Sequence, residues 1–143
     1  MKYLSKSLEE TNEIAKNFLD TIKYIGKGYV VALEGELGSG KTNFAQVAGK
    51  ILGIEENMHS PTFVIMKIYA INFKNFKNLI HIDAYRIEKE SELLHLGWQE
   101  IIKEPENLIL IEWPEKVSSL IPETARKISF QHIDETTREI SYD

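Results

Sequence analysis

The residues best suited to chemistry lie in a glycine-rich stretch, residues 35–42, which reads GELGSGKT. Glycines in such a stretch let successive backbone N–H groups turn inward around a phosphate group. A helix that starts directly after it offers its positive N-terminal end to the same oxygens. In this GxxxxGK[ST] pattern Lys41 reaches the β- and γ-phosphates, and the Thr42 hydroxyl is a ligand for Mg²⁺. We therefore predict a nucleotide-binding loop with contacts from Glu36, Leu37, Gly38, Ser39, Gly40, Lys41, Thr42 and Asn43.

Two acidic residues stand directly after short apolar runs and are candidates for the rest of a metal site. Asp83 follows LIHI, and Glu112 follows LILI. An acid at the end of a buried strand commonly completes the Mg²⁺ shell beside a phosphate loop. One carboxylate can hold the metal, directly or through water, while the other orients the attacking water. We favour Asp83 for the metal and Glu112 for the water, with a helix cap as the alternative for either residue.

Thr62 and Arg86 are further candidates for contact with phosphate. Thr62 lies in the sequence SPTF, shortly after the expected loop helix. A threonine in that place contacts the γ-phosphate and Mg²⁺ when its segment acts as a nucleotide switch; an ordinary turn before a strand is the alternative. Arg86 follows Asp83 closely and can either reach a phosphate or pair with a neighbouring glutamate on the surface.

Apolar runs and helical stripes indicate the elements that must position these residues. Short runs rich in β-forming residues predict buried strands at residues 29–33, 79–82 and 108–111. Ser7 and Glu10 have the spacing of a helix capping box, and glycines at 26 and 28 are expected to end that helix. Helical spacing predicts further helices at 41–52, 88–103 and 114–120. A strand at 63–71, a turn at 72–78 and an antiparallel pair at 127–133 and 138–142 complete the pattern.

Three buried strands separated by helices indicate an α/β fold with a mainly parallel central sheet, flanked by helices and extended by antiparallel strands. The phosphate loop makes this a P-loop NTPase-like arrangement, and the chain of 143 residues predicts a single domain over 1–143. In such sheets ligands bind at the carboxyl ends of the strands. Gly35, Asp83 and Glu112 each stand at such an end, so we expect them to share one edge of the sheet.

Composition excludes several classes of protein. Hydrophobic residues make up 43% and charged residues 27% of the chain, close to the globular average. The absence of cysteine excludes a disulfide scaffold, an iron–sulfur cluster and a thiol nucleophile. A net charge of −5 disfavours direct binding of nucleic acid. No run approaches the roughly 20 apolar residues that span a bilayer, and the N-terminus lacks a signal peptide's apolar core, so we expect a cytoplasmic protein without membrane contact.

Together the motifs resemble those of the TsaE family, the small ATPase subunit of the bacterial machinery that makes threonylcarbamoyladenosine in tRNA. The matching pieces occur in order along nearly the whole chain: GELGSGKT at 35–42, SPTF at 60–63, HIDAYR at 81–86, ELLHLG at 92–97 and IEWPE at 111–115. Many families share the phosphate loop, whereas the other motifs in this spacing are far more specific. Glu36 differs from the aspartate that is commoner in this family's loop.

The resemblance implies roles for individual residues, with ATP and Mg²⁺ as cofactors. The residues implied in catalysis are Lys41, Thr62 and Glu112, and those implied in metal binding are Thr42, Asp83 and Glu112. Trp113 is implied to lie near the nucleotide and Thr11 near the adenine. The implied partners are the threonylcarbamoyl-transferase subunit and its paralogue, of the TsaD and TsaB types, and tRNA is met only through that complex. ATP hydrolysis is implied to drive or reset the complex.

Two other functions use the same loop. A small-molecule or nucleotide kinase is the main alternative, although the chain has few arginines for a phosphate-clamping lid. A GTP-driven switch is disfavoured because no guanine-reading motif is present. His81, inside an expected strand, is interpreted as a hydrogen-bonded core residue or, less favourably, as a base. The lysines at 67, 74 and 77 fit a solvated hairpin tip better than a surface for tRNA.

Overall fold

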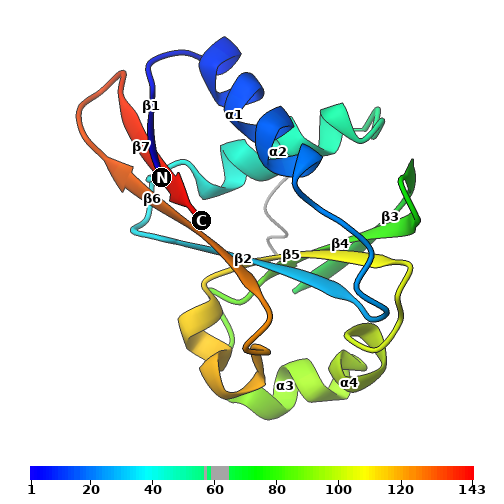
Figure 1. The fold of residues 1–143 in the computed structure, drawn as a ribbon. Helices are drawn as coiled ribbons and strands as arrows, with labels where there is room; N and C mark the ends of the chain where they lie inside the picture. The colour runs from blue at the N-terminus through cyan, green and yellow to red at the C-terminus, as the bar shows by residue number, and fades with distance from the viewer. Residues whose placement is uncertain (57, 59–64) are drawn as a thin grey trace.

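The computed structural model describes residues 1–56, 58 and 65–143, which form a seven-stranded sheet with helices on both faces (Figure 1). The strands are β1 (Lys2–Ser5), β2 (Tyr29–Gly35), β3 (Met66–Phe73), β4 (Phe76–Asp83), β5 (Asn107–Glu112), β6 (Arg126–His132) and β7 (Arg138–Tyr142). The helices are α1 (Leu8–Asp20), α2 (Lys41–Ile51), α3 (Glu90–His95), α4 (Trp98–Ile101) and the 3-10 helix η1 (Pro114–Leu120). Helices α1 and α2 cover one face of the sheet, and α3, α4 and η1 lie against the other.

The centre of the sheet is parallel and its edges are antiparallel. The strand order is β1-β7-β6-β2-β5-β4-β3, and β6, β2, β5 and β4 run parallel to one another. The pairs β3–β4, β6–β7 and β1–β7 are antiparallel. The register places Asp83 opposite Glu112 and Glu112 opposite Leu33, two residues before Gly35. The expected α/β fold is confirmed. Gly35, Asp83 and Glu112 lie together at the carboxyl end of the parallel strands.

Alternation along β2 divides the apolar core into two layers. Val31 and Leu33 pack with α1 and α2, whereas Val30 and Ala32 pack with the helices on the opposite face. Phe18 of α1 and Phe44 of α2 are fully buried in the first layer, with their rings edge to face at 6.4 Å. Burying a side chain of that size contributes about 1.5–3 kcal/mol. The helix that follows the phosphate loop is thereby held against both the sheet and α1.

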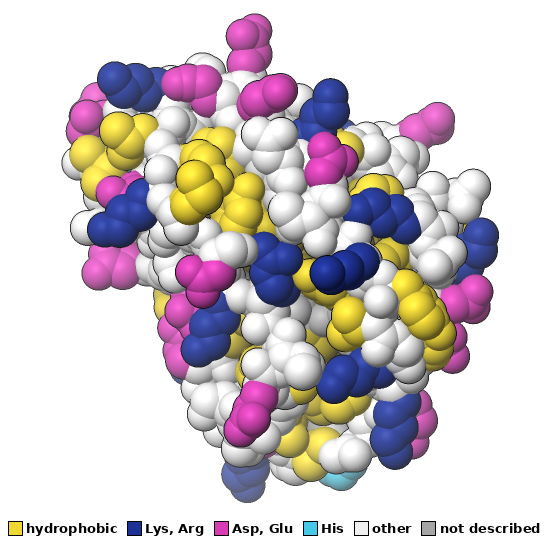
Figure 2. Space-filling model, in the orientation of Figure 1, with side chains coloured by type: hydrophobic (Ala, Val, Ile, Leu, Met, Phe, Trp, Pro, Cys, Tyr) yellow, Lys and Arg dark blue, Asp and Glu magenta, His cyan; other side chains and the backbone are white. Residues whose placement is uncertain are grey.

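The surface is mixed in charge. Acidic and basic side chains are interspersed on the face that Figure 2 shows, with hydrophobic side chains between them. In the part of the chain that the structure describes, no helix is long and apolar enough to cross a membrane.

Helix α1 begins as expected and ends earlier than expected. The Ser7 hydroxyl caps it by accepting from the Glu10 N–H at 3.1 Å. The helix ends at Asp20, so the expectation that it runs to the glycines at 26 and 28 is wrong. The Lys74 ammonium donates to the carbonyls of Leu19, Asp20 and Ile22. A side chain distant in the sequence thus supplies a donor to carbonyl groups at and just beyond the end of the helix.

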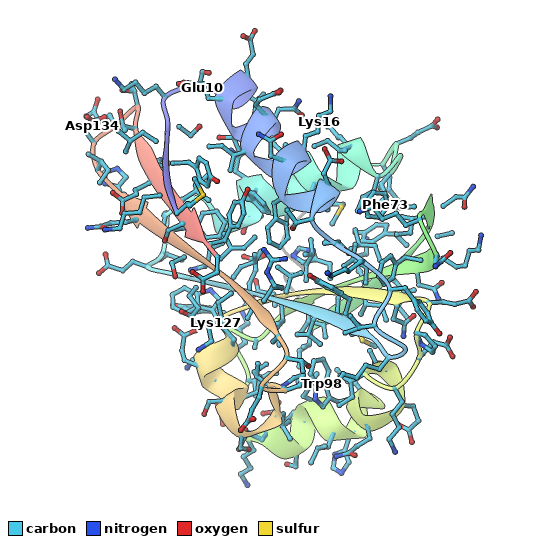
Figure 3. All side chains as sticks on the ribbon, viewed as in Figure 1. Glu10, Lys16, Phe73, Trp98, Lys127 and Asp134 are labelled. Atoms are coloured by element: carbon cyan, nitrogen blue, oxygen red, sulfur yellow. The ribbon has the colours of Figure 1, made fainter. Side chains whose placement is uncertain are left out.

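The single helix expected at 88–103 is also wrong, because α3 and α4 are separate. Gly97 lies between them with a φ of 92°, a left-handed conformation that glycine adopts without steric cost. The break lets Trp98 turn into the space between the sheet and these helices (Figure 3). Trp98 is 1% exposed, and its indole N–H donates to the Leu120 carbonyl at 3.0 Å. This contact joins the helical layer to η1.

The strand boundaries differ from expectation at three places. The turn expected at 72–78 is much tighter, because Phe73 already pairs with Phe76 across the β3–β4 hairpin. Residues 63 and 64 of the strand expected at 63–71 lie outside the described residues, and β3 begins at Met66. Strand β1 was not expected, and it adds a short edge strand beside β7. The antiparallel pair near the end of the chain is confirmed as β6 and β7.

Candidate nucleotide-binding site

The glycine-rich loop joins the end of β2 to the start of α2, in the environment expected for a phosphate loop. At Gly35 a Cβ atom would lie 2.5 Å from the Ser39 Oγ and 2.7 Å from the Phe130 carbonyl oxygen. These distances exclude any larger residue without movement of the backbone. The side-chain oxygen of Ser39 is buried and has no hydrogen-bond partner in the described structure. The loop therefore presents an unused polar group beside the N-terminus of an eleven-residue helix.

Lys41, the first residue of α2, folds back over its own loop. Its Nζ donates to the Gly35 carbonyl and, at 3.2 Å, to the Glu36 carbonyl. The same nitrogen lies 3.6 Å from the centroid of the Trp113 ring, a cation–π contact. Burial lowers the pKa of Lys41 from 10.5, although the carboxylates of Glu112, Glu115 and Asp83 oppose that shift. The ammonium is thus held among carbonyl oxygens, an aromatic face and acidic groups.

A continuous chain of polar contacts runs from α2 into the sheet. The Thr42 hydroxyl donates to Glu112 Oε1 at 2.8 Å. The other carboxylate oxygen, Oε2, lies 2.6 Å from His81 Nε2. Glu112 is 1% exposed and His81 is fully buried, so both oxygens of the carboxylate are bonded away from bulk water. The structure confirms that His81 is a hydrogen-bonded core residue and identifies its partner.

Asp83 lies at the same carboxyl end of the sheet as Glu112, but in a different environment. It is half-buried, and its Oδ1 accepts from the Tyr85 N–H at 3.0 Å, in the turn that follows β4. This is a local bond of the kind that the capping interpretation expects. The register nevertheless places Asp83 directly beside Glu112. Two acids thus flank the end of the loop, one buried and fixed and the other partly open.

Trp113 follows Glu112 in a left-handed backbone conformation, with φ 60° and ψ 52°. For a residue other than glycine this costs roughly 1–2 kcal/mol, and the following Pro114 begins η1. The indole packs against the Tyr85 ring, with centroids 4.9 Å apart, while Lys41 lies over it. The strained backbone is what brings the ring to the loop. The ring lies beside the loop through Lys41, and its proximity to a nucleotide stays a prediction.

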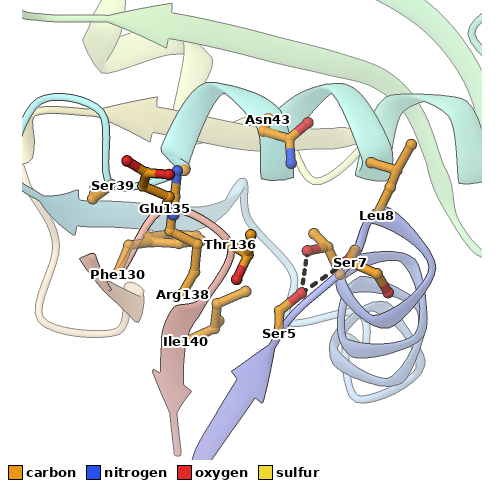
Figure 4. Close-up of a pocket in the computed structure, with 12 residues that line it drawn as sticks. Ser5, Ser7, Leu8, Ser39, Asn43, Phe130, Glu135, Thr136, Arg138 and Ile140 are labelled. Carbon is orange, nitrogen blue, oxygen red and sulfur yellow. Dashed lines mark hydrogen bonds between the residues drawn. The ribbon is translucent and has the colours of Figure 1, made fainter. Parts of the chain in front are cut away.

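A pocket of about 280 Å³ opens on the other side of the loop (Figure 4). Its walls come from β1, α1, the start of α2 and the β6–β7 hairpin, and its lining residues are Ser5, Ser7, Leu8, Thr11, Ser39, Gly40, Asn43, Phe130, Glu135, Thr136, Arg138 and Ile140. The Thr11 hydroxyl is 2.6 Å from the Ser5 hydroxyl, and this pair is buried. The Arg138 side chain lies near Gly40, at the beginning of α2. The pocket is therefore continuous with the phosphate loop.

The oxygen donors at the edge of the sheet are suited to Mg²⁺. Thr42, Glu112 and Asp83 offer hydroxyl and carboxylate oxygens. Among the described residues no group of three His, Cys, Asp or Glu side chains forms a ready metal cluster. Mg²⁺ in nucleotide sites takes only one or two protein ligands and completes its shell with phosphate and water. The donor set fits that arrangement.

The structure brings together most of the residues predicted for the site. Thr42 contacts Glu112 and Lys41 contacts Trp113, while Thr11, Ser39, Gly40 and Asn43 line the adjoining pocket. Glu36, Leu37 and Gly38 are exposed at the tip of the loop, and Thr62 lies outside the described residues.

Sequence reasoning did not identify Ser5 or Arg138, because the segments that carry them meet only in the folded sheet. The link between His81 and Glu112 was also missed. The alternation of β4, which puts His81 and Asp83 on one face, was the available signal.

Comparisons with known proteins agree with the motifs. The sequence profile described as "Threonylcarbamoyl adenosine biosynthesis protein TsaE" matches residues 5–140. A protein of Bacillus subtilis (strain 168), named tRNA threonylcarbamoyladenosine biosynthesis protein TsaE, is 34% identical over 142 residues, which are 99% of this chain and 84% of that protein. A protein of the same name from Treponema pallidum (strain Nichols) is 32% identical over 141 residues, 99% of this chain and 98% of its own.

Comparison of the fold with solved structures agrees with the sequence comparisons. The crystal structure of Bacillus subtilis YdiB matches with a TM-score of 0.70 and 30% sequence identity, over 99% of this chain and 83% of that one. The profile and the relatives cover the whole site as well as the sheet, and the resemblance expected from the motifs is confirmed. This chain belongs to the TsaE family.

Proposed function

We propose that this chain binds ATP with Mg²⁺ and hydrolyses it, as the ATPase subunit of the assembly that forms threonylcarbamoyladenosine in tRNA. Members of its family are named for that biosynthesis. The observation that carries the proposal is the convergence of Lys41, Thr42 and Glu112 at the carboxyl edge of a parallel sheet. Those three side chains are the types that phosphate and Mg²⁺ require at a nucleotide loop.

The phosphates and the nucleoside of the nucleotide bind on different sides of the loop. The phosphates bind to the backbone N–H groups of residues 35–42 and to the N-terminus of α2. The nucleoside enters the pocket between α1 and the β6–β7 hairpin, where Thr11 and Asn43 supply polar groups and Leu8 and Ile140 supply apolar ones. A volume of about 280 Å³ is close to the lower end of the range of small-ligand pockets, about 300–1,000 Å³.

Mg²⁺, when bound, neutralises phosphate charge and orients the reacting groups. Thr42 is the proposed direct ligand, and its bond to Glu112 supports a role for that acid on the metal side of the site. Asp83 is half-buried and adjacent in register, so it is able to hold a water molecule of the metal shell or to orient the attacking one. To reach the phosphates, the Lys41 ammonium exchanges its carbonyl and Trp113 contacts for phosphate oxygens.

The proposed partners are the threonylcarbamoyl-transferase subunit and its paralogue, the TsaD and TsaB types. We place tRNA on the assembled complex rather than on this chain alone. The net charge of −5 and the interspersed charges on the face in Figure 2 support that arrangement, because proteins that bind nucleic acid directly concentrate basic residues.

Steady-state ATP hydrolysis with Mg²⁺, measured alone and with the transferase pair, tests the proposal. We expect slow hydrolysis that rises when the pair is added, and loss of that rise in Lys41→Ala and Glu112→Ala. The exposed residues Lys50, at the far end of α2, and Glu106, before β5, give matched controls as Lys50→Ala and Glu106→Ala.

Three outcomes would contradict the proposal. Absence of ATP binding removes the nucleotide function altogether. Binding and hydrolysis without any response to the pair separate the loop from tRNA modification. Recovery of a phosphorylated acceptor after incubation with ATP and metabolites replaces the ATPase with a kinase.

A further inference from the structure

His81 has an environment that packing alone does not explain. It lies in β4, fully buried, with Ile80 and Ile82 on either side of it in the strand and Leu110 opposite it on β5. Its Nε2 is 2.6 Å from Glu112 Oε2, and its Nδ1 has no hydrogen-bond partner among the described residues. A buried polar atom without a partner is costly, and an apolar residue at this place would avoid that cost. The imidazole therefore requires another reason for its presence.

The reason lies in the carboxylate that it contacts. Glu112 is 1% exposed, and a buried carboxylate needs donors for its oxygens. Thr42 donates to Oε1, and His81 lies at Oε2. A carboxylate oxygen accepts hydrogen bonds, so in this contact the hydrogen lies on His81 Nε2. The other ring nitrogen, Nδ1, contacts no polar partner in the described structure, so the contact with Glu112 is the hydrogen bond that holds this ring.

We propose that His81 is a positioning residue for the nucleotide site and that it acts through Glu112. Its Nε2–H fixes one carboxylate oxygen, so the other faces the Thr42 hydroxyl and cannot rotate away. The Thr42 hydrogen is thereby directed to Glu112, and the lone pairs of the Thr42 oxygen are left to face a divalent cation. This inference rests on the proposed function and adds a residue two positions before Asp83, on the same face of β4.

Two variants separate positioning from packing. His81→Gln keeps an N–H donor near the place of Nε2, whereas His81→Met has a similar length and no donor. Donors that hold metal ligands in place commonly change affinity or activity by about 10–100-fold when removed. We therefore expect His81→Met to weaken Mg²⁺ binding in the presence of ADP, and to lower kcat, by about 10–100-fold. His81→Gln should stay within about threefold of the wild type. His95→Met, at an exposed position of α3, is the matched control.

The experiment has a readout that does not depend on turnover. Calorimetry gives the Kd of ADP without Mg²⁺ and the Kd of Mg²⁺ for the ADP complex, and hydrolysis assays give kcat and KM separately. Positioning through Glu112 predicts an unchanged Kd for ADP alone in every variant. It also predicts that His81→Met adds no further loss of kcat in a Glu112→Gln background, because the group through which it acts has been altered.

Several results would overturn the inference. One is a His81→Met protein that binds Mg²⁺ as the wild type does, and another is a His81→Gln protein as impaired as His81→Met. If His81→Met does not fold, His81→Asn replaces it, since the shorter amide cannot reach Glu112 and should lose what His81→Gln keeps. Failure of the wild type itself to bind ADP with Mg²⁺ would contradict the proposed function, and with it this inference, whereas the variant results above contradict the inference alone.

Discussion

The two halves of the candidate site are built in opposite ways. The central half, which we propose faces the phosphates, uses Lys41, Thr42, His81 and Glu112, on two parallel strands and the helix that begins beside them. Its side chains are mostly buried and are bonded to one another. The edge half, which we propose faces the nucleoside, is assembled from β1, α1 and the antiparallel β6–β7 hairpin. The proposed chemistry thus lies on the central parallel strands, and the proposed recognition lies at the antiparallel side of the sheet.

This difference has an energetic consequence. A change in the central half leaves a buried charge or a buried polar atom without its partner, which is costly and distorts the reacting geometry. A change at the edge removes a contact that water can partly replace. We therefore expect central substitutions to act on kcat and edge substitutions to act on nucleotide affinity.

The largest effect is expected from Gly35→Ala, because it displaces the loop that both halves share. The added Cβ would lie 2.5 Å from Ser39 Oγ and 2.7 Å from the Phe130 carbonyl, so the loop must move. We expect loss of nucleotide binding and destabilisation by about 1–3 kcal/mol, measured by calorimetry with ADP and by urea unfolding. Gly26→Ala is the control, since its Cβ meets no atom within 4 Å and costs only the strain of its positive φ. Normal binding in Gly35→Ala would show that the loop adapts.

Thr42→Val is expected to disable the central half alone. It keeps the shape of the side chain but removes both the proposed metal ligand and the donor to Glu112 Oε1. We expect kcat to fall by about 10²-fold or more, with ADP binding in the absence of Mg²⁺ nearly unchanged. Thr42→Ser keeps the hydroxyl and should recover most of the activity. Equal losses in both variants would assign the effect to the methyl group instead.

Thr11→Val tests the edge half. The substitution removes the hydroxyl that lies 2.6 Å from Ser5, inside the pocket. A lost hydrogen bond of this kind costs about 0.5–1.5 kcal/mol, so the KM for ATP should rise by about 2–10-fold while kcat stays within about twofold. Ser118→Ala, on η1 and outside this pocket, is the control. A fall in kcat without a change in KM would contradict the expectation that the edge half acts on nucleotide affinity and the central half on kcat.

The smallest effect concerns pH and the central half. Burial lowers the pKa of Lys41, so between that lowered pKa and 10.5 the unfolded chain binds more protons than the folded one. The free energy of unfolding therefore rises with pH in that interval, by at most about 1.4 kcal/mol per pH unit. Urea unfolding of the wild type and Lys41→Met, from about pH 8 upward, should show this rise in their difference. A difference that is flat or falls with pH would contradict the burial of the ammonium.

The central half could be predicted from the sequence because its signals are local. The glycine pattern at 35–42 and the continuous apolar runs before Asp83 and Glu112 each indicate one element and its end. The parallel sheet then brings those ends together without further information. The role of Thr62 stays a prediction, since that residue lies outside the described part of the chain.

Much of the edge half, apart from Thr11 and Asn43, could not be predicted, because its contacts join segments that are far apart in the sequence. Strand β1 is short and largely exposed, and it becomes a strand by pairing with β7. Arg138 reaches the pocket only because the β6–β7 hairpin folds beside α2. Gly97 was a local signal that residues 88–103 form two helices. The apolar stripe on both sides of it led to the prediction of one helix instead.

Lys74 gives the β3–β4 hairpin an influence on a pocket that it does not touch. Its ammonium holds the last carbonyls of α1, and the first turn of the same helix supplies Leu8 and Thr11 to the pocket wall. Helix α1 is therefore hydrogen-bonded to Lys74 at its C-terminal end and forms part of the pocket wall at its N-terminal end. Loss of the charge on this exposed amine, for example by acetylation, is expected to weaken these bonds at the end of α1. The hairpin tip and the proposed nucleoside pocket are thus connected through a single helix.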